Sequence, residues 1–138
     1  MKIEISVKKG VRANKASVRK VASGILKALR LKNIELSVLL TDDIGIRELN
    51  RTFRGIDKPT DCLSFPSGED EWLGDIAISI DKAAAQAKEF KVSFKSEMKR
   101  LLTHSVLHLM GFDHAKGGRR ARLMKEKVEE ILKVLGKR

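Results

Sequence analysis

The segment that decides the fold is residues 95–110, which read KSEMKRLLTHSVLHLM. Its second half is apolar on nearly every side, through Leu101, Leu102, Val106, Leu107, Leu109 and Met110. A helix that is apolar around its whole circumference is buried among other elements. Gly111 can end this helix by adopting a left-handed conformation. We therefore predict a central, buried helix around which the rest of the chain is arranged.

Strands and helices interleave on both sides of this helix. Alternating or branched apolar residues predict strands over 2–7, 34–40, 61–65 and 74–80. Helical periodicity predicts helices over 14–30, 41–53 and 81–90, and a last basic helix after the two glycines at 117–118. Thr41 and Asp81 are the expected caps of the second and third helices.

These elements predict an α+β fold in which residues 1–138 form a single layered domain. It would have a small mixed four-stranded sheet and about five helices, with the helix at 95–110 central and buried. A chain of 138 residues suits one core. In the last helix, the residues expected to face inward are Leu123, Met124, Val128, Ile131 and Leu135.

Composition and cysteine usage narrow the class of protein. The sequence contains no run of about 18 apolar residues of the kind that forms a membrane-spanning helix. The N-terminus lacks the apolar core of a signal peptide. We therefore expect a cytoplasmic protein without a membrane partner. Cys62 is the only cysteine, which excludes an intrachain disulfide and a cluster of thiolate metal ligands. We interpret it as a small core residue.

Charge is unevenly distributed along the chain. The net charge is +11, with ten basic residues and one acid in residues 1–32, and eleven acids against four bases in residues 33–81. The last segment, residues 116–138, is again basic. This distribution indicates a polyanionic partner such as RNA. The alternative is a solvated, lysine-rich surface without a dedicated partner.

All three histidines of the chain lie within eleven residues, at His104, His108 and His114. The first two are four residues apart on the predicted helix, so their rings project from one face. Gly111 allows a sharp turn that can bring His114 back as a third ligand. A lone histidine on an apolar helix is usually structural, but three at this spacing indicate a transition-metal site with one open position. Ligation by imidazoles alone favours zinc, with nickel, copper or cobalt as alternatives in vitro.

The spacing H-x3-H-x2-G-x2-H matches that of the metzincin metalloproteases. Their general-base glutamate follows the first histidine, where this chain has Ser105. Serine does not accept a proton as a carboxylate does. A peptidase of that mechanism is therefore disfavoured, although the metal ligands are retained.

Three sequence blocks together resemble the bacterial YbeY family of endoribonucleases and ribosomal-RNA maturation factors. The first is the histidine segment at 104–114, the second is LNRTFRGIDKPTDCLSFP at 49–66, and the third is LGDIAI at 73–78. The blocks follow the order found in the family. The resemblance spans nearly the whole chain, although the family usually has glycine at position 105 and tyrosine at position 112.

The resemblance implies a single-strand-specific, zinc-dependent endoribonuclease with one Zn2+ per chain, held by His104, His108 and His114. It also implies RNA as the partner, namely ribosomal RNA of the small subunit, together with the ribosome or ribosome-associated proteins. The expected role is ribosomal RNA processing and late ribosome maturation or quality control.

The resemblance further places Arg54 near the metal, where its guanidinium could clamp a phosphate oxygen as the catalytic residue. The alternative is a structural Arg54 paired with Asp57 or Asp61. Asp113 would orient a histidine ligand or cap the turn.

Two other functions remain open at this point. One is a metal-dependent hydrolase of another substrate class, including a peptidase-like enzyme. The other is a ribosome-assembly factor that binds RNA and in which the zinc is structural.

Overall fold

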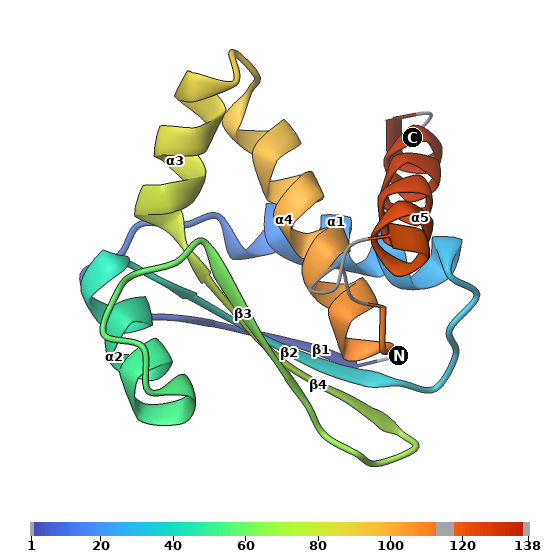
Figure 1. Cartoon of the computed structure of the whole chain (residues 1–138), viewed down its shortest axis with the longest axis horizontal. Coiled ribbons are helices and arrows are strands. Elements are labelled where there is room, and N and C mark those ends of the chain that lie inside the picture. The colour runs from blue at the N-terminus through green and yellow to red at the C-terminus, as the bar shows by residue number, and fades with distance from the viewer. Residues whose placement is uncertain (1, 113–117, 137–138) are drawn as a thin grey trace.

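A computed structural model describes residues 2–112 and 118–136 of the chain. The strands of this part are β1 (Lys2–Val7), β2 (Glu35–Thr41), β3 (Cys62–Pro66) and β4 (Trp72–Ser79). The helices are α1 (Lys15–Ala28), α2 (Asp43–Arg54), α3 (Ile80–Glu89), α4 (Phe94–Leu109) and α5 (Gly118–Gly136). Figure 1 shows their arrangement.

The four strands form one mixed sheet in the order β1-β2-β4-β3. The pairs β1–β2 and β2–β4 are parallel, whereas β3 runs antiparallel to β4. The α+β fold with a mixed four-stranded sheet is therefore confirmed. In this order β3 lies at an edge of the sheet, so one of its sides is available to a site.

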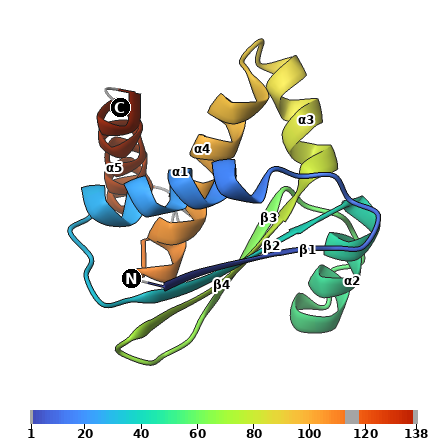
Figure 2. The same ribbon diagram turned by 180° about the vertical axis from the view of Figure 1, so that it is seen from behind.

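Apolar side chains alternate between the two faces of the sheet, as the two-residue period of a strand requires. In β4, Ile76 and Ile78 point into the main core with α1 and α4, whereas Ala77 points to a smaller core with Ile46 of α2. Helices α1 and α4 thus cover one face and α2 covers the other, as the two opposite views show (Figures 1 and 2).

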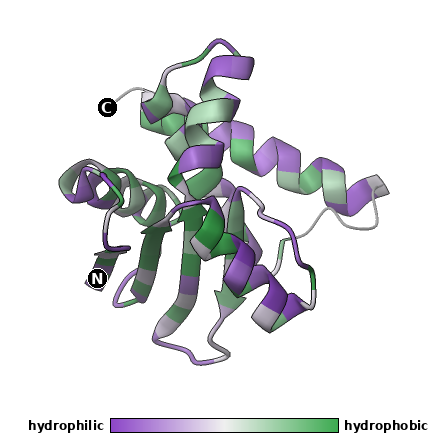
Figure 3. Cartoon of the chain, turned by 90° about the vertical axis from the view of Figure 1, so that its left-hand side faces the viewer, coloured by the Kyte–Doolittle hydropathy of each residue, from purple (hydrophilic) through white to green (hydrophobic). Residues whose placement is uncertain are grey.

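Helix α4 is the most buried helix of the described chain, as its sequence predicts. It packs against β3, β4 and the helices α1, α3 and α5. Nine of its sixteen residues are buried. Hydrophobic colour follows the strands and the inward sides of the helices (Figure 3). None of the described helices is both long and apolar enough to cross a membrane.

Two predicted helix caps are wrong by one or two residues. Asp42 is the N-cap of α2, where its carboxylate accepts a hydrogen bond from the Gly45 amide, while Thr41 is the last residue of β2. Ser79 likewise replaces Asp81 as the cap of α3. In both cases sheet pairing of Thr41 with Ser79 sets where the strands end and the helices begin.

Two residues predicted to face inward are exposed instead. Leu123 is 48% exposed and Met110 is 37% exposed, whereas Met124, Ile131 and Leu135 are buried as predicted. Adjacent residues on a helix point about 100° apart, so the burial of Met124 turns Leu123 outward. Met110 follows α4 as its C-cap and leaves the buried face.

Candidate metal centre

His104 and His108 lie on one face of α4, and their ring nitrogens converge. The two Nε2 atoms are 2.9 Å apart, with ring centroids 4.5 Å apart and the ring planes at 70°. Both side chains are partly exposed, whereas Leu102, Val106 and Leu107 are fully buried. The apolar residues thus anchor α4 against its neighbours and present the two imidazoles at its accessible edge.

The predicted third ligand, His114, and the neighbouring Asp113 lie outside the described residues. Just before them, Gly111 follows α4 with a φ of 97°, the left-handed conformation expected at this position. Its amide donates to the His108 carbonyl, and the Phe112 amide donates to the Leu107 carbonyl. The predicted end of the helix at this glycine therefore agrees with the structure, while the ligand role of His114 stays a prediction.

The two described imidazoles fit a shared zinc ion. Nitrogens that bind one zinc at about 2.0–2.1 Å cannot lie more than about 4.2 Å from each other, and the observed 2.9 Å satisfies this limit. Within residues 2–112 and 118–136 no group of three or more candidate ligand side chains is found. A third ligand from the described part of the chain is therefore not in place, and the set requires a residue such as His114.

The histidines open into a pocket of about 480 Å³ at the sheet edge formed by β3. It lies between α4, β3 and the C-terminal end of α2, the elements that carry its lining residues; Figure 1 shows where these elements lie. Its lining residues come from these elements and the start of β3: Arg54, Asp61, Cys62, Leu63, Ser64, Pro66, His104 and His108. A guanidinium, a carboxylate and two imidazoles thus share one open hollow.

Arg54 is brought to this pocket by the packing of α2 against β3. It is the last residue of α2, which Gly55 ends in a left-handed conformation with a φ of 71°. The preceding Phe53 packs on Phe65 of β3 with ring centroids 5.3 Å apart. The end of the helix is thereby held beside the edge strand, and the guanidinium lines the same hollow as the histidines.

The alternative pairing of Arg54 with Asp57 or Asp61 is not formed among the described residues. Asp57 accepts two hydrogen bonds from Arg47, at 2.8 and 3.2 Å, and this pairing lowers the pKa of Asp57. Asp61 accepts hydrogen bonds from neighbouring neutral groups instead. Arg54 therefore lines the pocket without either of the ion pairs that would mark it as a structural loop residue.

Asp61 lines the pocket, although the sequence suggested it only as a possible ion-pair partner of Arg54. Its carboxylate accepts a hydrogen bond from the Cys62 amide at 2.8 Å and one from the Gln86 amide group at 3.3 Å. Arg100 of α4 donates to Gln86 at 3.5 Å and to the buried Glu97 at 2.6 and 2.9 Å. This chain of bonds joins β3, α3 and α4 and orients the Asp61 carboxylate at the pocket wall.

The β3 residues beneath the histidines face α4. The Ser64 hydroxyl donates to the Ser105 carbonyl at 3.2 Å, which joins the edge strand to α4. Burial raises the pKa of the Cys62 thiol to about 12, and the charge of Asp61 acts in the same direction. The thiol is therefore neutral near pH 7 and is not an activated nucleophile. Cys62 packs against the main core and also lines the pocket.

Ser105 does not face the pocket. It is fully buried at 0% exposure and is absent from the lining, although it follows His104 directly. A neighbouring residue on a helix points about 100° away, and here that direction leads into the protein. The position that would hold a protease-like glutamate therefore has no access to the open pocket.

Comparison with known proteins identifies the family of this chain. The family model described as Endoribonuclease YbeY matches residues 2–136. A relative from Aquifex aeolicus, named Endoribonuclease YbeY, is 47% identical over 130 residues, covering 91% of this chain and 87% of the relative. One from Caldicellulosiruptor bescii with the same name is 48% identical over 123 residues, covering 78% and 77%.

The fold also matches a solved structure. The solution structure of TM1509 from Thermotoga maritima has a TM-score of 0.67 and 28% identity, covering 98% of this chain and 92% of that one. The agreement thus extends over the sequence and the arrangement of helices and strands. The resemblance proposed from those blocks is confirmed: this chain belongs to the YbeY family.

Proposed function

We propose that this protein is an endoribonuclease that cleaves single-stranded RNA with a zinc ion held by His104, His108 and His114. One observation carries the proposal: the Nε2 atoms of His104 and His108 converge to 2.9 Å in a pocket that Arg54 also lines. Membership of a family whose relatives are named endoribonucleases supports RNA as the substrate.

In the proposed reaction, the metal and the side chains of the pocket would have different roles. When bound, zinc supplies Lewis-acid polarisation of a phosphodiester, and imidazole-only ligation suits this ion. Arg54 binds nonbridging phosphate oxygens through its planar guanidinium and stabilises charge that develops on them. The Asp61 carboxylate accepts hydrogen bonds from groups of the RNA that enter the pocket.

A pocket open at the sheet edge suits a single strand. Its hollow of about 480 Å³ has room for a few atoms of backbone and base beside the metal. Bases of a single strand can splay apart, which lets a phosphodiester enter such a hollow. We propose that the cytoplasmic substrate is ribosomal RNA of the small subunit, reached on the ribosome or through ribosome-associated proteins, during RNA processing and late ribosome maturation.

The test uses one preparation with a defined zinc content. Purified protein is incubated with single-stranded RNA, duplex RNA and a panel of peptides, before and after treatment with a chelator. We expect cleavage of single-stranded RNA alone, loss of cleavage with the chelator and recovery on adding zinc. Variants His104→Ala, His108→Ala and His114→Ala should each lose zinc in mass spectrometry of the intact protein. Full zinc occupancy in all three variants, or peptide hydrolysis in place of RNA cleavage, contradicts the proposal.

A ribosome-assembly role that needs binding alone is separated in cells. A folded variant without cleavage activity, such as Arg54→Ala, replaces the native protein, and ribosomal RNA ends and subunit profiles are measured. Unprocessed ends support cleavage as the function. Normal ends and normal subunits would show that binding suffices and that the zinc is structural.

A further inference from the structure

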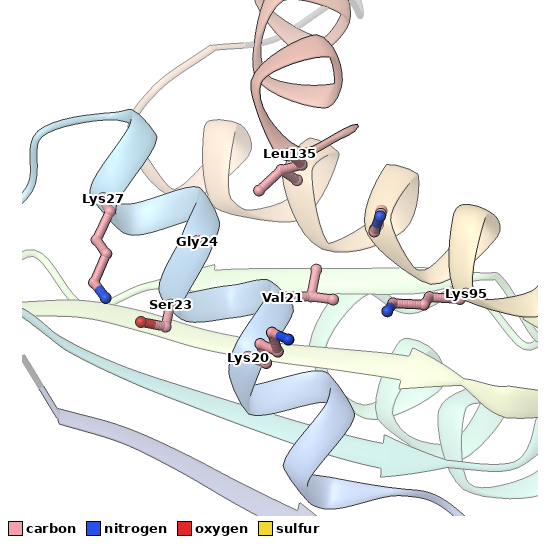
Figure 4. Close-up of a pocket in the computed structure, with 8 residues that line it drawn as sticks. Lys20, Val21, Ser23, Gly24, Lys27, Lys95 and Leu135 are labelled. Carbon is pink, nitrogen blue, oxygen red and sulfur yellow. The ribbon is translucent and has the colours of Figure 1, made fainter. Parts of the chain in front are cut away.

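A second hollow, of about 240 Å³, lies between α1, α4 and the end of α5, and four lysines line it. Figure 4 shows Lys20, Ser23 and Lys27 on α1, Lys95 on α4 and Leu135 on α5 around this space. The fourth lysine is Lys99. We call this hollow, with its lysines Lys20, Lys27, Lys95 and Lys99, the lysine groove.

The lysines form two facing stripes. On α1, Lys20, Ser23 and Lys27 are separated by three and four residues and so share one side of the helix. On α4, Lys95 and Lys99 are four residues apart and share a side in the same way. Each wall of the groove therefore carries a pair of lysines.

Packing between helices closes one end of the groove. A Cβ on Gly24 would lie 2.9 Å from the Leu135 Cδ2 atom, so α1 and α5 approach each other closely at this glycine. Val21 forms part of the floor and is buried. The shape of the hollow is thus set by the packing of α1 against α4 and α5.

The positive charge of the groove is not neutralised by the part of the protein that the structure describes. No acidic residue lines the hollow, and no carboxylate of residues 2–112 or 118–136 forms an ion pair with any of its four lysines. Four ammonium groups gathered without counter-charges repel one another, and an anion in the groove relieves this repulsion.

The groove faces away from the metal centre. On α4, Lys95 precedes His104 by nine residues and Lys99 precedes His108 by nine, a separation of about 180° around a helix with 3.6 residues per turn. Lysines and histidines therefore occupy opposite sides of α4, whose diameter with side chains is about 10–12 Å. An anion in the groove cannot be the one that reacts in the metal pocket.

We propose that the lysine groove binds the phosphodiester backbone of RNA at a distance from the cleaved bond. Lys20 and Lys27 are seven residues apart, or about 10 Å along α1 at about 1.5 Å per residue. Successive phosphates of one strand can contact both ends of such a row and both walls at the same time. This inference rests on the proposed function and adds an anchoring site that serves RNA long enough to reach around α4.

The test compares two double variants of the zinc-loaded enzyme. Lys20→Gln/Lys95→Gln removes one charge from each wall, and Lys9→Gln/Lys88→Gln removes two exposed charges outside the groove. For a long single-stranded RNA, the groove variant should raise KM several-fold, with kcat within twofold of the parent. The slope of log KM against log salt should fall by about 1.4, or about 0.7 for each lost phosphate contact. The control variant should leave KM and slope near those of the parent.

Substrate length supplies the second readout. A trinucleotide that occupies only the metal pocket should be cleaved equally by the parent and the groove variant. Equal KM changes in both double variants would overturn the inference and indicate a diffuse charge effect. Loss of binding to anionic lipid vesicles with unchanged RNA kinetics would also overturn it, in favour of a membrane surface.

Failure of the inference is distinguishable from failure of the proposed function. If the parent enzyme cleaves RNA and the groove variant has the same KM and salt slope as the parent, the groove inference alone fails. If the parent cleaves no RNA, the proposed function fails, and fluorescence anisotropy with labelled RNA still measures the groove. Weaker RNA binding by the groove variant than by the parent and the control variant then supports the groove inference. Equal RNA affinity of all three proteins overturns it.

Discussion

At the scale of single residues, the pocket combines local and distant contributions. His104 and His108 come from one helix face, so their convergence follows from their spacing alone. Arg54 and Asp61 come from other elements and meet the histidines only in the folded chain. Replacing Arg54, an exposed residue that lines the pocket, should change activity. Replacing Ser105, which is buried and does not line the pocket, should change stability.

We predict that Arg54→Ala slows single-turnover RNA cleavage by roughly 10²–10³-fold, as expected for the loss of one preorganised donor in the transition state. Arg54→Lys should recover little, because an ammonium cannot form the same bidentate contact. Arg54 is exposed and has no ion pair with Asp57 or Asp61 in the described structure. Melting temperature and zinc content should therefore match the parent, and a parental cleavage rate would remove this residue from the active site.

Ser105→Glu should not produce a peptidase. The new carboxylate would start from a fully buried position that does not line the pocket, and burying an unpaired charge costs several kcal/mol. We expect a lower melting temperature and no peptide hydrolysis, measured by thermal unfolding and a peptide panel. Ser105→Ala is the control and should retain RNA cleavage. Efficient proteolysis by Ser105→Glu would show that this position reaches the metal.

At the scale of elements, the edge strand β3 forms the wall of the pocket and depends on its antiparallel pairing with β4. Gly74 of β4 has a φ of 144°, and a Cβ there would lie 2.4 Å from the Phe65 carbonyl oxygen and 2.9 Å from Leu109 Cδ2. This glycine therefore allows β4 to approach both β3 and α4. The position of the pocket depends on that approach.

Gly74→Ala should destabilise the protein by about 2 kcal/mol or more, because it adds steric overlap to an unfavourable backbone conformation. Thermal or denaturant unfolding measures the change. Gly68→Ala is a matched control, since Gly68 also has a positive φ, 76°, but no atom lies within 4 Å of an added Cβ. It should cost only about 1–2 kcal/mol. Equal losses in the two variants would show that contacts at Gly74 have no role.

At the scale of the whole molecule, charge and site are separated. The histidine pocket lies where α4 meets α2 and β3, which belong to the acidic segment of residues 33–81, while the basic helix α1 forms a wall of the groove behind α4. Figure 2 shows α1 on the side of the molecule opposite the view in Figure 1. Under the two proposals, long-range attraction of RNA and the cleavage step would take place at different surfaces.

RNA affinity should fall steadily as salt rises, because basic residues release counterions from the phosphates. Each contact with a single strand adds a slope of about −0.7 to the plot of log affinity against log salt. Fluorescence anisotropy with a labelled single strand between low and physiological salt measures this slope. A flat plot would be inconsistent with RNA bound through the basic helices, whatever the cleavage activity.

Sequence alone determined the features that depend on neighbours along the chain. Strand β1 has the predicted bounds, α4 is the predicted buried helix, and the two histidines share a face, because periods of two and 3.6 residues are local properties. The YbeY blocks added Arg54, whose place at the pocket no local pattern indicates. Gln86 illustrates the limit, since its hydrogen bond to Asp61 spans 25 residues and follows no spacing rule.

Only the tertiary structure decided the features that depend on which elements meet. The strand order β1-β2-β4-β3 puts β3 at the edge beside α4, which opens the pocket and turns Ser105 inward. The pairing of Thr41 with Ser79 set the helix caps against the predicted residues. The lysine groove arises where α1 meets α4, more than 60 residues apart in the chain. Periodicity predicts which side of a helix is polar, but packing between distant segments determines what that side faces.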